Sequence, residues 1–175
     1  PVDPDALSAH GSRETPRLPQ PDFPRVMVVA NQKGGVGKTT TAVNVAAGLA
    51  QGGLRVLVID ADPQGNASTA LGVEHDVGTP GTFEVLVDGV PLIDVLQKSP
   101  DIPGLWVSPA TIDLTGAEIG LVATVSRETK LKQALDTFFD KYHVDYVLID
   151  CPPSLGLLTL NALVAAREIL IPIQA

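Results

Sequence analysis

A glycine-rich stretch between an apolar run and a helical pattern constrains the fold most strongly. Residues 31–40 read NQKGGVGKTT and directly follow the apolar run 26–30. Small and aliphatic side chains then recur at helical spacing from Ala42 to Ala50, until Gly52 and Gly53 end the pattern. The sequence therefore predicts a buried strand, a tight loop and an amphipathic helix in succession.

Further short apolar runs predict the rest of a sheet. They cover 55–59, 105–108, 145–149 and 168–173, and they are apolar throughout rather than alternating, as in strands that are covered on both faces. A second amphipathic helix is predicted over 126–142, with Glu128 and Lys132 as an i,i+4 pair on its exposed face. The segment 71–103, which lies between the apolar runs 55–59 and 105–108, is expected to hold at most short helices. We expect an α/β fold with a mostly parallel twisted sheet and helices on both faces.

The chain divides into two predicted parts. Residues 1–24 contain six prolines and no apolar period, which predicts a flexible arm, read either as a disordered leader or as a partner-binding tail. Residues 25–175 are predicted to form a single domain. Its last apolar run has no helix after it, so we expect the C-terminal part of this domain to be missing.

Composition narrows the function classes. A net charge of −8 argues against DNA binding by the whole surface, so any DNA contact must be a local patch. The apolar runs are too short to cross a bilayer, and the first residues do not resemble a secretory leader, so we expect a cytoplasmic protein without membrane contact. Three dispersed histidines and a lone cysteine predict no structural metal; Cys151 and Trp106 are expected in the core.

The glycine-rich loop has the chemistry of a phosphate site. Glycines let consecutive N–H groups point inward around an anion, here from Gly34, Gly35, Val36 and Gly37. A helix that starts near Lys38 adds a partial positive charge. Lys38 can reach the β- and γ-phosphate oxygens, and the hydroxyl of Thr39, which precedes Thr40, can bind Mg²⁺. ATP and Mg²⁺ are therefore the expected ligands.

Acidic residues follow two of the predicted strands. Asp60 and Asp62 come after 55–59, and Asp150 comes after 145–149. Ligands of open parallel sheets bind at the carboxyl ends of the strands, so these carboxylates are expected beside the phosphate loop. Asp150 is predicted to bind Mg²⁺ directly or through water, and an acid after 55–59 can orient a water or hold the metal. Without the loop, such acids would more often be caps or turn formers.

Details of these segments resemble a known family. The general Walker pattern has a glycine where this chain has Gln32, and Lys33 stands just ahead of Gly34. This arrangement resembles the deviant Walker ATPases, which include ParA, MinD, ArsA and the nitrogenase iron protein. The sequences DPQGN at 62–66 and DCPPSLG at 150–156 resemble ParA/Soj-type partition ATPases in particular.

The resemblance implies roles for individual residues. Lys33 would reach the phosphates of a partner subunit across a nucleotide-sandwich homodimer, in a role comparable to that of an arginine finger. Asp62 would position the attacking water, or hold Mg²⁺ with Thr39 and Asp150. Asn66 would assist in the segment that follows Asp62, and Asp60 would lie near the metal or be structural.

The resemblance also implies a cellular function. The expected protein is an ATPase with weak intrinsic turnover, whose ATP-bound dimer binds DNA nonspecifically in the full-length chain. A ParB-type centromere-binding protein would stimulate hydrolysis, so that a chromosome or plasmid is segregated at the nucleoid. Two alternatives stay open: a MinD-like positioning ATPase at membranes, and a non-catalytic fragment that binds nucleotide or a partner.

Overall fold

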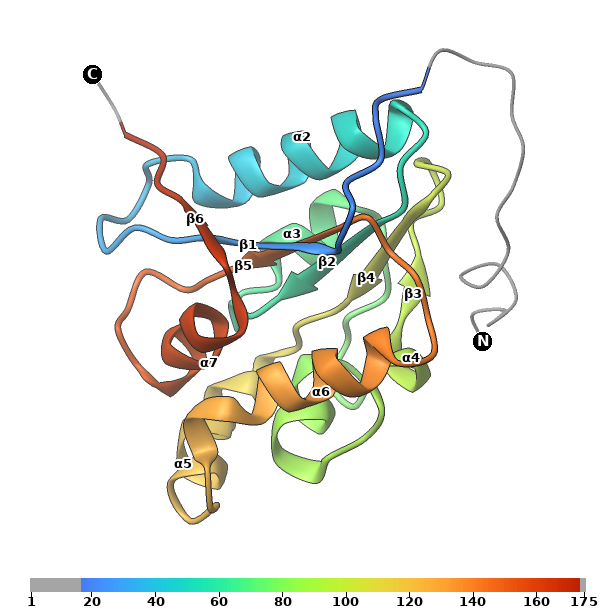
Figure 1. Ribbon diagram of the computed structural model, residues 1–175. Coiled ribbons are helices and arrows are strands. Elements are labelled where there is room, and N and C mark those ends of the chain that lie inside the picture. The colour runs from blue at the N-terminus through green and yellow to red at the C-terminus, as the bar shows by residue number, and fades with distance from the viewer. Residues whose placement is uncertain (1–16, 174–175) are drawn as a thin grey trace.

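The computed structural model describes residues 17–173, which build a six-stranded sheet in the order β3-β4-β2-β5-β1-β6 (Figure 1). Five strands run parallel, and β3 at one edge is antiparallel to β4. The strands are β1 Arg25–Val29, β2 Val56–Asp60, β3 Gln97–Lys98, β4 Leu105–Ser108, β5 Tyr146–Asp150 and β6 Glu168–Leu170. The predicted α/β fold is confirmed. The short polar strand β3 was not predicted, and β6 ends at Leu170 rather than at 173.

Helices cover both faces of the sheet (Figure 1). One face carries α2 Lys38–Gln51 and α3 Asn66–Ala70. The other carries the π-helix η1 Glu84–Asp88, α4 Leu92–Val95, the 3-10 turn η2 Ile112–Gly116, α5 Ala117–Val122, the 3-10 turn η3 Arg127–Thr129, α6 Lys130–Phe139 and α7 Leu157–Ala165. As predicted, 71–103 holds only short elements; α7 was not foreseen as a helix.

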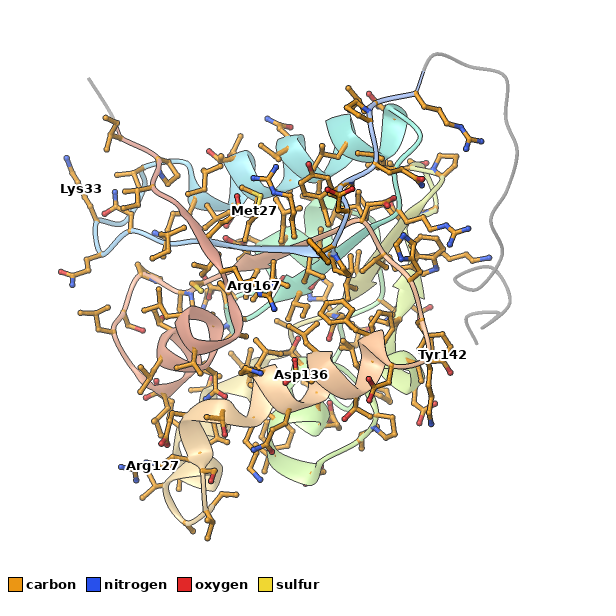
Figure 2. All side chains as sticks on the ribbon, viewed as in Figure 1. Met27, Lys33, Arg127, Asp136, Tyr142 and Arg167 are labelled. Atoms are coloured by element: carbon orange, nitrogen blue, oxygen red, sulfur yellow. The ribbon has the colours of Figure 1, made fainter. Side chains whose placement is uncertain are left out.

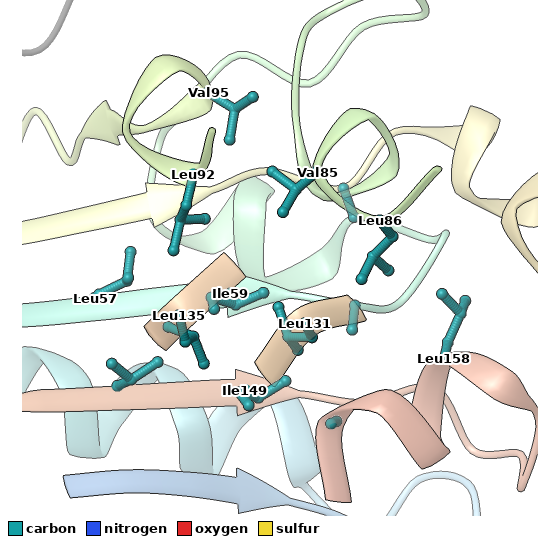
Figure 3. Packing of buried hydrophobic residues seen from close by; sticks show 14 of the residues in the cluster. Leu57, Ile59, Val85, Leu86, Leu92, Val95, Leu131, Leu135, Ile149 and Leu158 are labelled. Carbon is teal, nitrogen blue, oxygen red and sulfur yellow. The ribbon is translucent and has the colours of Figure 1, made fainter. Parts of the chain in front are cut away.

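Strand β2 shows why the runs are apolar throughout. Successive side chains of a strand point to opposite faces, so Val56 and Val58 join the core under α2 and α3. Leu57 and Ile59 join the other core, where Figure 3 shows Ile59 close to Leu131 of α6. Residues 56–59 therefore all need apolar side chains, whichever face they point to.

Helix α2 lies close to the sheet because its buried side chains are small. Ala42, Ala46 and Ala50 face inward. The helix ends as predicted: Gly53 takes a left-handed φ of 86°, and the Leu54 amide donates to the Leu49 carbonyl. This closure turns the chain back toward β2.

Helix α6 begins later than predicted. Ser126 takes a left-handed φ of 55°, and Arg127–Thr129 form the 3-10 turn η3, so the α-helix starts at Lys130. The predicted pair of Glu128 with Lys132 was wrong: Lys132 pairs with Asp136, because Glu128 lies in the turn before the helix.

A buried amide of α7 fixes this helix start. The Asn161 side-chain oxygen accepts from the Leu131 amide at 3.2 Å, while its nitrogen donates to the Arg127 carbonyl at 2.8 Å. These contacts are long-range in sequence, so helical periodicity around 126–142 carries no trace of them.

The predicted arm falls mostly outside the described residues. Of its part within them, 17–24 forms neither helix nor strand, and the Leu18 amide donates to the Gly52 carbonyl at 2.9 Å. Within 17–173, no helix combines the length and apolar character that a bilayer span requires.

Candidate nucleotide site

The loop between β1 and α2 is shaped by its glycines. Gly35 and Gly37 have φ values of 71° and 81°, a backbone region that side chains other than glycine rarely adopt. A Cβ atom placed on Gly34, Gly35 or Gly37 would meet no atom within 4 Å. Packing inside the domain therefore does not require these glycines, whereas the left-handed backbone favours glycine at Gly35 and Gly37.

The two lysines of this loop lie in opposite surroundings. Lys38 is the first residue of α2, is only 7% exposed, and donates from Nζ to the Lys33 carbonyl at 3.2 Å. Its ammonium group thus stays against the loop. Lys33 is exposed, and Figure 2 shows its side chain extending away from the domain.

Asn31 holds the start of the loop, a role that the sequence reading did not assign. Its side-chain oxygen accepts from the Lys33 amide at 2.9 Å, and its nitrogen donates to the Pro172 carbonyl at 2.9 Å. The first contact, two residues along the chain, is typical of an Asx turn and could have been anticipated. The second depends on β6 lying beside β1.

Asp150 at the end of β5 is a buried carboxylate with one oxygen in use. The Thr39 hydroxyl donates to Oδ2 at 2.7 Å, whereas Oδ1 is buried and has no hydrogen-bond partner among the described residues. Burial raises the pKa of Asp150 to about 7; the Thr39 hydrogen bond opposes the shift, and the charges of Asp60 and Asp62 add to it.

These donors fit a magnesium ion. Carboxylate and hydroxyl oxygens are the ligands that Mg²⁺ prefers, and a cation at Oδ1 would satisfy an atom that is otherwise costly to bury. Within 17–173, no group of three His, Cys, Asp or Glu side chains is arranged to hold a metal. This agrees with the usual coordination of Mg²⁺ in nucleotide sites, where one or two protein carboxylates bind the ion and phosphate oxygens and water are its other ligands.

Asp60, on the neighbouring strand, has both oxygens in use. Oδ1 accepts from the Asp62 amide at 3.1 Å, and Oδ2 accepts from the amide and hydroxyl of Ser68 at 2.9 and 2.7 Å. Burial raises its pKa to about 6, against the lowering effect of the Ser68 bonds. These contacts favour the structural reading of Asp60, and Ser68 is a partner that the sequence did not reveal.

Asp62 and Asn66 lie in the segment after β2, whose backbone donates hydrogen bonds to the Asp60 carboxylate. Asp62 is 8% exposed, and its Oδ1 accepts from the Gln64 amide at 3.0 Å. Asn66 is exposed at the start of α3. Between them, Gly65 has a φ of 63°, and a Cβ there would lie 2.7 Å from Nδ1 of His75. Glycine at this position is thus required both by conformation and by space.

Strand register brings the predicted residues to one edge. Asp150 on β5 is level with Val29 at the end of β1 and with Asp60 at the end of β2. The phosphate loop and the acidic strand ends therefore meet, as the sequence predicted. The remaining loop residues differ in exposure: Val36 is buried and Thr40 is exposed on α2. The buried core positions predicted for Trp106 and Cys151 are confirmed, and burial raises the pKa of the Cys151 thiol to about 12.

Known proteins share this sequence and architecture. A family model described as an AAA domain matches residues 24–175. The sporulation initiation inhibitor protein Soj of Bacillus subtilis is 52% identical over 150 residues, which cover 86% of this chain and 58% of Soj. The chromosome partitioning protein ParA of Myxococcus xanthus is 51% identical, with 86% of this chain and 52% of ParA covered. The chain thus spans a little over half the length of these relatives.

A solved structure shows the same fold. The crystal structure named cobyrinic acid a,c-diamide synthase from Mycobacterium smegmatis, with bound ADP and magnesium, superimposes with a TM-score of 0.79 at 43% identity, covering 86% of this chain and 60% of that one. A second structure of that protein holds an ATP analog and magnesium. The sequence identity, the family match and the shared fold together show that the chain belongs to the Soj/ParA family of chromosome partitioning proteins.

Proposed function

We propose that this chain is the nucleotide-binding part of a partition ATPase and that its phosphate loop binds Mg-ATP. The observation that carries the proposal is the Thr39–Asp150 pair, with the unpartnered Oδ1 of Asp150 buried beside the loop. ADP or an ATP analog with magnesium in the similar M. smegmatis protein supports the choice of ligand.

We propose separate roles in ATP binding and hydrolysis for the residues of this site. The amides of 34–37 hold the β-phosphate, and Lys38 neutralises charge on the β- and γ-phosphates. We propose that Mg²⁺ would be held by Thr39, Asp150 and Asp62. When bound, the ion would neutralise part of the negative charge of the phosphates. Asp62 also orients a water whose oxygen forms a bond to the γ-phosphorus while the bond from that phosphorus to the β,γ-bridging oxygen breaks. The proton of the water passes to the released phosphate, and ADP and inorganic phosphate leave. Asn66 assists at the start of α3.

Lys33 is proposed to act on a second subunit. Its exposed side chain extends away from its own domain, whereas Lys38 is held against the loop. In an ATP-sandwich homodimer, Lys33 would contact the partner's phosphates and so make hydrolysis depend on dimerisation. The predicted activity of the separate subunit is accordingly weak.

The complete protein is proposed to work on DNA in the cytoplasm, at the nucleoid. Its ATP-bound dimer binds DNA nonspecifically through a local basic patch, because the net charge of −8 disfavours binding by the surface as a whole. A ParB-type centromere-binding protein stimulates hydrolysis and releases the dimer, and repeated cycles segregate a chromosome or plasmid. The partitioning relatives support this role.

Calorimetry and gel filtration of the intact protein test the proposal. Lys38→Ala is expected to abolish the heat of Mg-ATP binding. Lys33→Ala and Asp62→Ala are expected to retain that heat and to lose turnover, and Asp62→Ala also retains ATP-driven dimerisation. Normal turnover in Asp62→Ala would remove this residue from catalysis.

Gel filtration, together with binding to liposomes and to DNA, separates the alternatives. A species that stays monomeric in saturating ATP would support the non-catalytic fragment. ATP-dependent binding to liposomes, without DNA binding, would support the membrane-positioning ATPase instead.

A further inference from the structure

A cavity of about 310 Å³ lies between α6 and the η1–α4 segment, on the face of the sheet opposite to α2. Its floor consists of buried apolar side chains, including Val85, Leu92 and Phe138. Small-molecule sites occupy roughly 300–1,000 Å³, are lined mainly by apolar groups and carry a few polar ones. This cavity has the size of a site for a small ligand.

The backbone around η1 explains why the space stays open. η1 is a π-helix, a rare conformation that often occurs at functional sites. Gly89 ends it with a left-handed φ of 71°, and Pro91 precedes α4. The chain therefore turns sharply between two short helices, and Gly89 contributes no side chain to fill the gap that faces α6.

The charged residues that line the cavity have one sign. They are Lys130 and Lys141, near opposite ends of α6, and neither forms an ion pair within 17–173. Asp136 lies on α6 but pairs with Lys132, which is outside the lining. Figure 2 shows Asp136 on this helix and the lining residue Tyr142 just beyond its end.

We propose that this cavity binds a small molecule with an apolar body and one anionic group, such as a medium-chain carboxylate. The apolar body fills the space over Val85, Leu92 and Phe138. The anion pairs with Lys130, which is half-buried, so that the attraction is less screened than at a fully exposed lysine.

Ligands of equal length and different charge test this proposal on the intact protein. Binding of octanoate, octanol and octylamine is measured by calorimetry or ligand-observed NMR. Octanoate is expected to bind about tenfold more tightly than octylamine, because the lysines attract one and repel the other. Thr137→Trp, a change at an exposed lining position, is expected to block all three ligands by filling the mouth.

Matched lysine variants locate the anion. Lys130→Gln is expected to weaken octanoate severalfold and to leave octanol unchanged. Lys132→Gln removes a lysine from the same helix outside the cavity and is expected to change neither.

The proposal fails if octanoate does not bind, if octylamine binds equally well, or if Thr137→Trp leaves octanoate binding intact. Heat of Mg-ATP binding, measured in the same samples, reports separately on the phosphate loop, so a failure here leaves the proposed ATPase function untouched.

Discussion

Asp60 and Asp150 end neighbouring strands at the same level of the sheet, and both are fully buried. Their surroundings differ. Among residues 17–173, Asp60 accepts three hydrogen bonds from the turn and helix that follow it, whereas Asp150 accepts one, and its Oδ1 has no partner. Residue type, burial and position at a strand end are the same for the two acids, so they cannot distinguish a structural acid from the metal ligand that we propose. The hydrogen-bond partners of the individual oxygens do distinguish the two acids.

The largest expected effect is the loss of ATP turnover when Asp150 is changed. Asp150→Asn removes the charge that would hold Mg²⁺, so Mg-dependent ATP turnover of the intact protein is expected to fall at least about 100-fold. Chemical denaturation without metal should show little loss of stability, since a buried charge has been removed. Substantial turnover in this variant would contradict the proposal that Asp150 holds the metal.

The matched change at the neighbouring strand should act on stability. In Asp60→Asn, one carboxylate oxygen is replaced by an NH₂ group, which cannot accept a hydrogen bond. Either the Asp62 amide or the Ser68 donors then lose their acceptor, and the remaining oxygen is a poorer acceptor than a carboxylate. Leaving one buried donor unpaired costs about 1–3 kcal/mol of unfolding free energy. Urea unfolding measures this loss, and turnover per folded molecule should survive. Loss of turnover at full stability would assign Asp60 to the metal instead.

A pH series sharpens the contrast between the two acids. Burial raises the pKa of Asp150 to about 7 and that of Asp60 to about 6, both above the ordinary value of about 3.9 in an unfolded chain. At a pH between the unfolded value of about 3.9 and these folded values, the folded protein holds protons that the unfolded chain has released. The stability contributed by these two acids is therefore fully present below about pH 4 and is lost as pH rises to about 7. In metal-free protein, Asp150→Asn should flatten this fall more than Asp60→Asn. Identical slopes for Asp150→Asn and the unmodified protein would contradict the assignment.

The smallest effect is expected at Ser68. Its hydroxyl donates to Asp60 and accepts from the Ala110 amide at 3.0 Å. Ser68→Ala removes both contacts, at an expected cost of about 1–2 kcal/mol in thermal unfolding. Thr69→Ser, on the same short helix but at an exposed position, is the control, because it keeps the hydroxyl that contacts the Gly65 carbonyl and His75. An equal loss in both variants would show that α3, rather than the bonds to Asp60, sets the effect.

Local patterns were sufficient for the parts of the site that lie within short segments. The glycines, Lys38 and Thr39 stand in one loop, and Asp150 ends an apolar run, so parallel-sheet geometry alone placed them together. The same holds for α2, whose glycine stop closes within a few residues of the last helical turn.

Contacts between different elements of the fold could not be predicted, whether the residues are eight or thirty positions apart. Ser68 reaches Asp60 only because α3 folds back over β2, and Asn161 fixes the start of α6 from a helix some 30 residues later. The left-handed Ser126 likewise breaks a periodicity that the neighbouring residues continue. In each case, the deciding interaction is tertiary and overrides the local propensity.

The position of β1 has a consequence for synthesis on the ribosome. This strand pairs with β5 and β6, so the residue opposite Arg25 is Tyr146, about 120 positions later. At about 5–20 residues per second, roughly 6–25 seconds pass between translation of the two. During that interval the apolar β1 segment has no neighbour in the sheet. Nascent chains must therefore be protected from aggregation longest at the segment that leads into the nucleotide loop.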